Sequence, residues 1–386
     1  MNQNVAIKRR MDTILTGENI ITYAAVSIFL PYVLTAIILI FLAVYILVNR
    51  QTRQLVFVHA GSNFLKMFCL YAVTIPVLYG NWKGMATGIG FALALVLGLF
   101  LRSVMTRERY ERTLTLICSL SLTSAGFAFF EAFLNFVNHD GHIHRISAGF
   151  SHPNYFGSVA AAVIVVCAYK VFTSHESKFY FCLIAVANII SLYLCKSMFA
   201  FIEVFIGILV LLAVLKKKKL LALWLSAAVI LGAMIFFFRV GLIPRLSDVE
   251  ITVRLRQNIW RLAIRQIKED PFFGHGFMSF DYLFDTVIRS RQVAHAHNIY
   301  LDMLLNFGVV GSLLFLGYFA RYYLSVSFAW ITDKRNVPAA LILAITAANL
   351  VHGATDLTLL WIQTFPLFLI ILSGQGAQEQ RLSSEM

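Results

Sequence analysis

Long apolar runs separated by short polar loops make up most of the chain. The runs are close to twenty residues long, the length of a helix that crosses about 30 Å of hydrocarbon. Only 13% of the residues are charged and 59% are hydrophobic, whereas a soluble globular chain averages about 25% charged. The pattern predicts an all-α polytopic membrane protein with about twelve transmembrane helices in a single integral domain over residues 1–386. The expected spans are 14–30, 32–48, 55–77, 85–101, 114–138, 155–173, 179–195, 199–215, 220–238, 298–320, 338–355 and 358–373.

The basic residues between the runs predict the orientation, because positively charged loops stay in the cytoplasm. The densest basic run is Lys216–Lys219. If this run is cytoplasmic, the alternation of twelve spans places every other short basic loop on the same side. Lys8–Arg10 join that side only if Pro31 divides residues 20–48 into two spans instead of one long tilted helix. We therefore expect both termini in the cytoplasm, and the basic start to be a retained anchor.

The formal net charge of +13 would indicate a nucleic-acid partner in a soluble protein. Here basic loops hold the cytoplasmic ends of the spans against anionic lipid. Membrane lipid is thus an expected partner and nucleic acid is not. Two segments are expected outside: the short segment 139–154, and a long loop over 239–297 that contains nine Lys/Arg and six Asp/Glu.

The centre of the long loop, residues 251–270, has helical periodicity. One face of this helix would be basic, with Arg254, Arg261, Arg265 and Lys268. The opposite face would be apolar, with Ile259, Trp260, Ala263 and Ile267. Arg256 falls on the apolar face, where an unpaired guanidinium is costly. It either reaches back to the surface, pairs with Asp248 or Glu250, or binds a phosphate in a cavity.

Three histidines follow this helix. His275 lies in a turn that Gly274 and Gly276 permit. His295 and His297 alternate, as metal ligands often do, but no further cluster of Cys, His or carboxylate residues completes a site, so no metal site is expected. His297 opens the next span, where unpaired N–H groups favour an anion and a neutral imidazole. It is either a catalytic base or an interfacial histidine that water satisfies.

Further polar residues lie near the external ends of spans. Arg145 precedes Asn154, which either caps the next span or reaches over the same cavity. His352 and Asp356 are spaced i, i+4 near an external end, and ionisable groups in spans are functional candidates. Weaker candidates of the same kind are Glu131, Glu203 and Asp302.

These residues carry a resemblance to a known family. The order R-x-x-x-W (Arg256 to Trp260), D-P-x-x-G-x-G-F (Asp270 to Phe277) and H-N-x-x-L-x-x-L-x-x-x-G-x-x-G (His297 to Gly311) resembles the signature of the O-antigen polymerase and ligase superfamily. Its earlier motif is similar to R-x-x-x-G-F-x-x-P-N (Arg145 to Asn154), and a later one to V-H-G-x-x-D (Val351 to Asp356). The resemblance covers about residues 140–375.

The resemblance implies a glycosyltransferase with a C-type membrane fold in a bacterial cytoplasmic (inner) membrane. Such an enzyme needs no metal or other cofactor and inverts the anomeric centre. Its donor is a glycan on undecaprenyl diphosphate. The implied catalytic residues are Arg256 and His297, and His297 either activates the acceptor hydroxyl or orients the diphosphate. The implied substrate-binding residues are Arg145, Asn154, Arg254, Arg265, His275, Asn298 and His352.

Two stretches depart from the pattern of the family. Many relatives have Ser-Arg-Gly where this chain has Ser197-Met198-Phe199, and Asn-Pro-Asn where it has His152-Pro153-Asn154. The first departure weakens any role for that span. The second keeps Asn154 and adds His152.

The acceptor is open at this stage. We favour a polymerase that extends an exopolysaccharide, capsule or O-antigen, with a chain-length regulator and a flippase as its partners. A ligase that passes the finished glycan to lipid A core or to another acceptor is the alternative. A transporter or flippase of lipid-linked sugars is the rival of another class, and it would show internal repeats, which we do not find.

Overall fold

The computed structural model describes residues 16–56, 62–138, 144–174, 176–238, 249–284, 287–288, 291–332 and 337–385. Within these ranges nearly all residues are helical, and the strands are the two-residue β1 (Val287–Ile288) and β2 (Arg291–Gln292), which pair antiparallel. The expected all-α polytopic class is therefore confirmed. The first helices are α2 (Gly17–Ser27), α3 (Tyr32–Val48), α4 (Arg50–Val56), α5 (Ser62–Leu78), α6 (Trp82–Val104), α7 (Arg107–Asn138), α8 (Pro153–Thr173) and α9 (Lys178–Cys195). The later ones are α10 (Met198–Val214), α11 (Lys218–Phe238), α12 (Val249–Glu269), α13 (Ser279–Leu283), α14 (Ile299–Thr332), α15 (Val337–Gly353), the 3-10 turn η2 (Thr358–Leu360) and α16 (Thr364–Glu385).

Length and apolar composition allow six of the described helices to cross a membrane, or seven if α3 and α4, bent by 99°, form one broken span. The six are α6, α7, α8, α9, α11 and α14. Four further apolar helices are shorter: α5, α10, α15 and the Thr364–Ala377 part of α16. Each of the twelve expected spans contains a helix, but twelve separate crossings stay a prediction.

The division at Pro31 agrees with the expectation of two segments. Helix α2 ends at Ser27, and Pro31 occupies the cap position of α3. The hydroxyl of Thr35 donates to the carbonyl of Ser27 at 2.6 Å, which satisfies an acceptor that the end of α2 leaves free. Residues 20–48 are therefore two helices with a turn between them.

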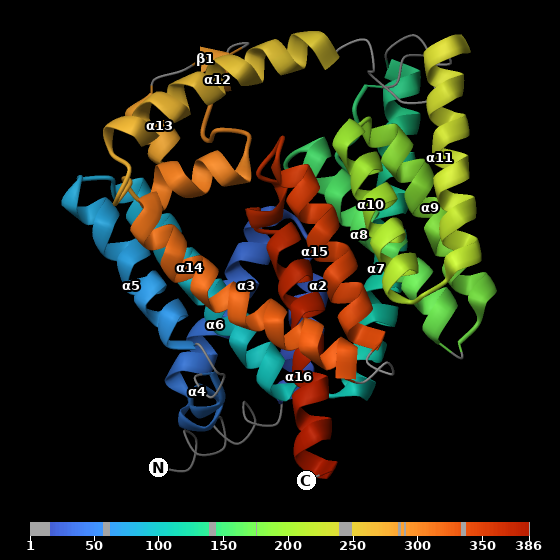
Figure 1. Ribbon diagram of the computed structural model, residues 1–386, viewed down its shortest axis with the longest axis horizontal. Coiled ribbons are helices and arrows are strands. Elements are labelled where there is room, and N and C mark those ends of the chain that lie inside the picture. Colours follow the sequence, from blue (N-terminus) through green and yellow to red (C-terminus); the bar gives the residue numbers. More distant parts are fainter. Residues whose placement is uncertain are drawn as a thin grey trace.

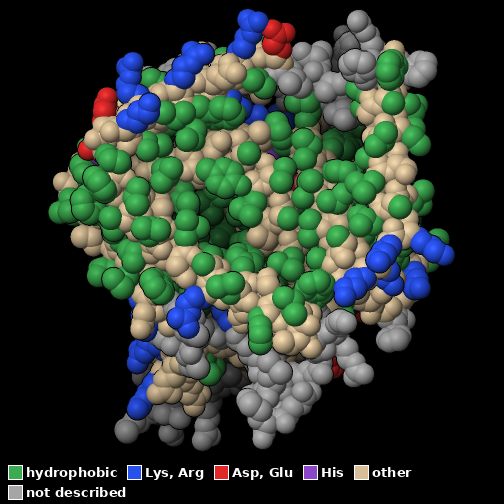
Figure 2. Space-filling model, viewed as in Figure 1, with side chains coloured by type: hydrophobic (Ala, Val, Ile, Leu, Met, Phe, Trp, Pro, Cys, Tyr) green, Lys and Arg blue, Asp and Glu red, His purple; other side chains and the backbone are tan. Residues whose placement is uncertain are grey.

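The helices form a bundle whose sides are apolar (Figures 1 and 2). Large side chains such as Phe179, Leu70 and Val229 are between 71% and 77% exposed, which is typical of a surface that faces lipid and not water. Helix α8 is the most buried of the candidate spans, whereas α11 is peripheral and packs on α10. In Figure 1 the end of α16 and α4 lie at one end of the bundle, and α12 lies across the other.

Helix α12 is amphipathic, as its sequence predicted. Ile259 and Ala263 are buried in a small core with Phe280, Ala296 and Leu305. The basic residues of the opposite face, Arg254, Arg261, Arg265 and Lys268, are all exposed. The helix therefore covers one end of the bundle with its apolar side and presents its basic side outward (Figure 2).

Helix α14 corrects an expectation, because the span predicted over 298–320 is not continuous. Gly308 has a φ of 55° and a ψ of −165°, which breaks the helix. The N–H groups of Val309 and Val310, which lose their helical partners there, donate to the carbonyls of Pro271 and Phe272 at 2.9 and 3.0 Å. Gly308 therefore sets the direction of the chain at this point.

The glycine turn that follows α12 fits into this break. Gly274 and Gly276 both have positive φ, as the sequence indicated. A Cβ on Gly274 would lie 2.6 Å from the backbone of Asn306, and one on Gly276 would lie 2.5 Å from Pro76. The turn therefore joins α12 to α5 and to the first part of α14, which lies under α12 in Figure 1.

Candidate active site beneath helix α12

Asp356 lies in the turn that follows α15. The N–H groups of Thr355 and Asp356 both donate to the carbonyl of His352, at 2.9 and 3.1 Å. The carboxylate side chain is 5% exposed, and its Oδ1 accepts the N–H of Leu357 at 2.9 Å. The backbone of the turn therefore fixes the direction of a buried carboxylate.

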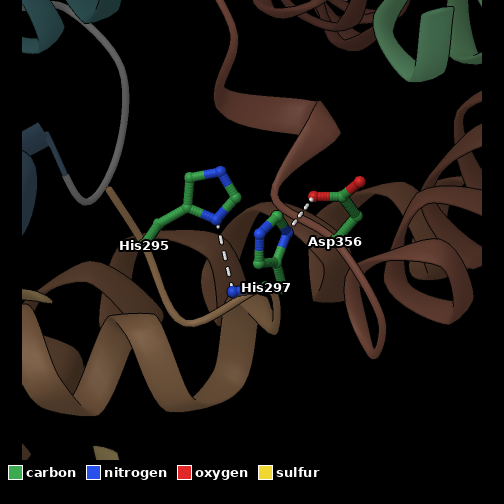
Figure 3. Close-up of side chains that lie close together, drawn as sticks. All are labelled: His295, His297 and Asp356. Atoms are coloured by element: carbon green, nitrogen blue, oxygen red, sulfur yellow. Dashed lines mark hydrogen bonds and ion pairs between the residues drawn. The ribbon is translucent and has the colours of Figure 1, made fainter. Parts of the chain in front are cut away.

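His297 comes to this carboxylate from the segment before α14. Its Nδ1 lies 3.1 Å from Oδ1 of Asp356, and its backbone N–H donates to Nδ1 of His295 at 3.2 Å. Figure 3 shows the three side chains together, with His297 between His295 and Asp356. His297 has a φ of 49°, a left-handed conformation that costs an ordinary residue roughly 1–2 kcal/mol. The surrounding contacts hold the ring in this position against that cost.

Asn298 links the start of α14 to the turn that contains Asp356. Its side-chain oxygen accepts the N–H groups of Tyr300 and Leu301, each at 3.0 Å, so Asn298 caps α14. Its side-chain amide donates to the carbonyl of Ala354 at 2.9 Å. The expectation that His297 lies at a helix N-terminus thus holds within one residue. Asn298, which we expected to bind substrate, anchors the entry to α14 on the turn of Asp356.

The carboxylate of Asp356 decides which ring nitrogen of His297 carries a proton. Burial by itself would raise the pKa of Asp356, but the hydrogen bond and charge of His297, with smaller contributions from His295 and His352, hold that pKa well below its ordinary value. An ionised carboxylate only accepts hydrogen bonds, so Nδ1 of His297 carries a proton. In the neutral ring, Nε2 then has the free lone pair, which is the arrangement of a general base oriented by a carboxylate.

Asn154 and Arg145 extend this arrangement across the bundle. The side-chain amide of Asn154 donates to Oδ2 of Asp356 at 2.6 Å. Nη2 of Arg145 donates to the side-chain oxygen of Asn154 at 2.5 Å, and its Nε donates to the carbonyl of Cys195 at 3.2 Å. The two residues do share the site, as the sequence suggested. His152, and not Asn154, caps α8, because its Nδ1 accepts the N–H of Asn154 at 3.1 Å.

Arg256 reaches the same region from α12. It is half-buried, and its guanidinium carbon lies 5.3 Å from the centre of the Phe199 ring, within cation–π range. Phe199 in turn stacks on His352 at 6.1 Å. Phe199 belongs to the stretch that departs from the family pattern, and here its ring contacts both groups.

His352 is part of a buried polar cluster. Its Nδ1 lies 2.9 Å from Oε2 of Glu203, and Oε1 of Glu203 accepts the hydroxyl of Ser158 at 2.9 Å. Helices α15, α10 and α8 each supply one of these residues. Since a buried carboxylate needs a partner, the pair explains why Glu203 occurs within an apolar helix. The one sign of Glu203 in the sequence was the position of an ionisable residue within a predicted span.

His295 supports His297 without contacting Asp356 directly. Burial, the largest cause, and the charges of His297, His152 and Arg256 together lower the pKa of His295 to about 4, against the opposing effect of Asp356. The ring is therefore neutral over the physiological range, and its Nδ1 can accept the N–H of His297.

The three groups His295, His297 and Asp356 also correct an expectation. The sequence showed no further cluster of Cys, His or carboxylate residues that would complete a site with the two histidines, so we expected no metal site. In the described part of the chain these three side chains form a group whose ligand atoms all lie within 4.8 Å of one another. Asp356 lies 59 residues beyond His297, so only the tertiary structure could bring it there.

Three expected site residues lie elsewhere. Arg254 is exposed and forms an ion pair of 2.5 Å with Glu250, and Arg265 lies on the exposed face of α12. His275 is buried in the glycine turn, where its ring packs against that of Tyr79 in a tilted arrangement, with 4.4 Å between the ring centres. Burial lowers the pKa of His275, and the charge of Asp270 partly opposes the change. The structure gives these residues no contact with Asp356 or His297.

Comparison with known proteins supports the resemblance. Residues 183–316 match the family described as O-antigen ligase. A protein named O-antigen ligase from Pseudomonas aeruginosa is 32% identical over 182 residues, which cover 43% of this chain and 41% of that protein. The chain thus resembles the O-antigen polymerase and ligase superfamily, as its motifs predicted.

The matched family region contains part of the site. It includes Phe199, Glu203, Arg256 and His297, whereas Arg145, Asn154, His352 and Asp356 lie outside residues 183–316. The match spans less than half of the length of the curated relative. The contacts of Asp356 with His297 and Asn154 therefore link the matched region to its two flanks.

Proposed function

We propose that this protein transfers a glycan from undecaprenyl diphosphate to a hydroxyl acceptor on the extracytoplasmic side of a bacterial cytoplasmic membrane. The hydrogen bond between His297 and Asp356 is the observation that carries the proposal. It orients an imidazole with a free Nε2, beside a cationic group, in a chain that resembles O-antigen ligases. A base and a cation are what the reaction needs.

In the proposed step the acceptor hydroxyl attacks the anomeric carbon of the donor. The new bond joins the acceptor oxygen to that carbon, and the bond from the carbon to the diphosphate oxygen breaks with inversion. Nε2 of His297 takes the hydroxyl proton, and Asp356 stabilises the imidazolium that forms. The electron pair of the broken bond stays on the diphosphate, which leaves on its lipid.

Arg256 is the proposed cation for the leaving group. A guanidinium binds phosphate oxygens with two parallel hydrogen bonds and keeps its charge at every physiological pH. Its position over Phe199, on the inner side of α12, supports a role inside the site. Arg145 would act indirectly, because it forms a hydrogen bond with Asn154, which in turn forms one with Asp356.

The acceptor separates two versions of the proposal. We favour a growing glycan chain, as in a polymerase working with a flippase and a chain-length regulator, because the described residues form a membrane bundle without a separate soluble domain. Transfer of a finished glycan to lipid A core is the second candidate, and the names of the matched family and of the matched relative favour it. In vesicles with labelled donor, longer lipid-linked chains would identify a polymerase. Label on added core lipid would identify a ligase.

Asp356→Asn tests the proposed base. The amide keeps the size of the side chain but can donate to Nδ1, which removes the preference for the tautomer with a free Nε2. We expect the turnover of the vesicle assay to fall by at least roughly tenfold, while the KM for donor changes little. Asp281→Asn, which removes an external carboxylate bound to Lys83, is the matched control. Normal turnover for Asp356→Asn at normal protein levels would contradict the proposal.

The proposed reaction needs no metal ion, since Arg256 supplies the charge for the leaving group. Treatment of the vesicles with EDTA should therefore leave the rate unchanged. If chelation abolished transfer and one added divalent ion restored it, the metal-independent reaction would be wrong.

A further inference from the structure

His295, His297 and Asp356 together have the composition of a transition-metal site. Two imidazoles and one carboxylate are a common set of three zinc ligands, with the fourth position open to water. Their ligand atoms lie within 4.8 Å of one another, and the two imidazole rings are 4.3 Å apart between centres. Ligands of zinc lie about 2.0–2.2 Å from the ion. If each of the three ligand atoms moved inward by roughly 1 Å, which rotation of the side chains allows, all three would reach the ion.

The ligand types select the kind of ion. Imidazole suits Zn²⁺, Co²⁺, Ni²⁺ and Cu²⁺, whereas Mg²⁺ requires oxygen ligands in near-octahedral geometry. The cluster has two imidazoles and only one carboxylate. This donor set does not fit Mg²⁺.

We propose that His295, His297 and Asp356 bind Zn²⁺ and related imidazole-binding ions, and that the bound ion inhibits the enzyme. Binding of the ion does not depend on the proposed function. Inhibition does, because it follows from the role of His297 as the base. The ion takes a ring lone pair of His297, and a coordinated imidazole cannot accept the proton of a hydroxyl. The charge of Arg256 acts on His295, so we expect it to weaken the binding of a cation at the cluster.

His295 makes a separate test possible, because it is a proposed ligand but is neither the proposed base nor the proposed cation of the transfer reaction. His295→Ala removes one imidazole. His295→Asn also removes the imidazole, but its side-chain oxygen replaces Nδ1 as the acceptor for the N–H of His297. An effect seen in His295→Ala but not in His295→Asn would therefore come from a local loss of structure and not from the lost ligand. His144→Ala is the matched control, because His144 is an exposed histidine that is not part of the cluster.

Cobalt is the probe for binding. Purified full-length protein with its cysteines replaced by serine or alanine is titrated with Co²⁺ in detergent, without donor, and visible absorption is recorded. We expect the absorption of a low-symmetry Co²⁺ site to saturate at one ion per chain. It should be lost in both His295 variants, retained in His144→Ala and displaced by Zn²⁺. If the parent protein gave no such absorption, or if both His295 variants retained it, the metal site would be overturned, whatever the enzyme does.

Inhibition is measured in the vesicle assay, with each variant compared with its own rate without metal. We expect Zn²⁺ to inhibit the parent protein while Mg²⁺ at the same concentration does not. His295→Asn should require at least roughly tenfold more Zn²⁺ for half-inhibition. Binding of cobalt without any inhibition by zinc would leave the ion site standing, but would overturn the inhibition and, with it, the assignment of His297 as the base.

Discussion

At the scale of single residues, the two neighbouring histidines have different surroundings. His297 contacts a carboxylate that Asn154 and the backbone of Leu357 both hold, whereas His295 is a neutral acceptor for one backbone N–H. The H-N-x-x-L motif alone could not separate the two rings. The contacts support His297 as the base and give His295 a supporting position.

His297→Ala should therefore insert and accumulate normally but make no polymer, leaving single repeat units on the lipid carrier. A lost base lowers the rate by roughly 10²–10⁴-fold. His295→Ala, which leaves the hydrogen bond of Nδ1 to Asp356 in place, should cost much less. The measurement is the length and amount of lipid-linked glycan at matched protein levels. Normal polymer from His297→Ala, with loss of polymer in His295→Ala, would reverse the two assignments.

At the scale of elements, α12 and the break in α14 set the upper wall of the site. The apolar face of α12 packs on the small core that contains Ala296 and Leu305. Gly308 turns the chain so that the first part of α14 lies beneath α12 and brings His297 to the turn of Asp356. A helix running straight through residue 308 would leave Val309 and Val310 without their hydrogen bonds to the glycine turn. The break is therefore part of the construction of the site.

Within α12 we expect Arg256 and Arg261 to differ. Arg256 is half-buried over the ring of Phe199. Arg261 is exposed, and its guanidinium donates a hydrogen bond to the side-chain oxygen of Asn258 at 3.2 Å. Lysine keeps the charge but lacks the planar fork that binds phosphate. Arg256→Lys should therefore reduce transfer roughly tenfold or more, the effect of about 1.4 kcal/mol on the barrier. Arg261→Lys, the control, should stay near the rate of the unchanged protein. Equal rates for the two variants would leave Arg256 as a residue that only reaches back to the surface.

At the scale of the whole molecule, the positions of α16 and of Lys216 bear on the orientation of the bundle in the membrane. The end of α16 lies at the end of the bundle opposite α12 (Figure 1). Lys216 lies at the turn between α10 and α11, where its ammonium is 5.7 Å from the ring of Trp330 near the end of α14. Positive charge at a cytoplasmic surface is the ordinary arrangement. The site beneath α12 would then face outward, where a flipped lipid-linked donor presents its diphosphate.

Labelling of single cysteines tests this orientation. In a cysteine-free background, Arg265→Cys on the exposed face of α12 should react with an impermeant thiol reagent added to intact cells. Lys218→Cys, at the start of α11, should react only after the membrane is opened, because the basic run is expected to be cytoplasmic. The long loop also contains residues 239–248, which lie outside the described residues, so α12 is the better reporter. Labelling at position 218 from outside would overturn the topology.

The sequence alone predicted the features that depend on neighbours along the chain. Apolar runs gave the helices, Pro31 separated α2 from α3, and the periodicity of 251–270 gave the basic and apolar faces of α12. Gly274 and Gly276 indicated a turn. Each of these follows from local hydrophobicity or backbone freedom, which a window of about twenty residues contains.

Tertiary structure decided what lies together across long separations. Asp356 contacts His297 across 59 residues and Asn154 across 202, and the conformation of Gly308 depends on the backbone of Phe272 against it. The sequence pointed to most of these residues separately, as polar groups at the ends of spans. Their pairing is fixed by how α8, α14 and α15 pack, and contacts between helices distant in the chain leave no periodic signal. The choice of Asp356 as the partner of His297, and with it the third possible metal ligand, is therefore a property of the fold.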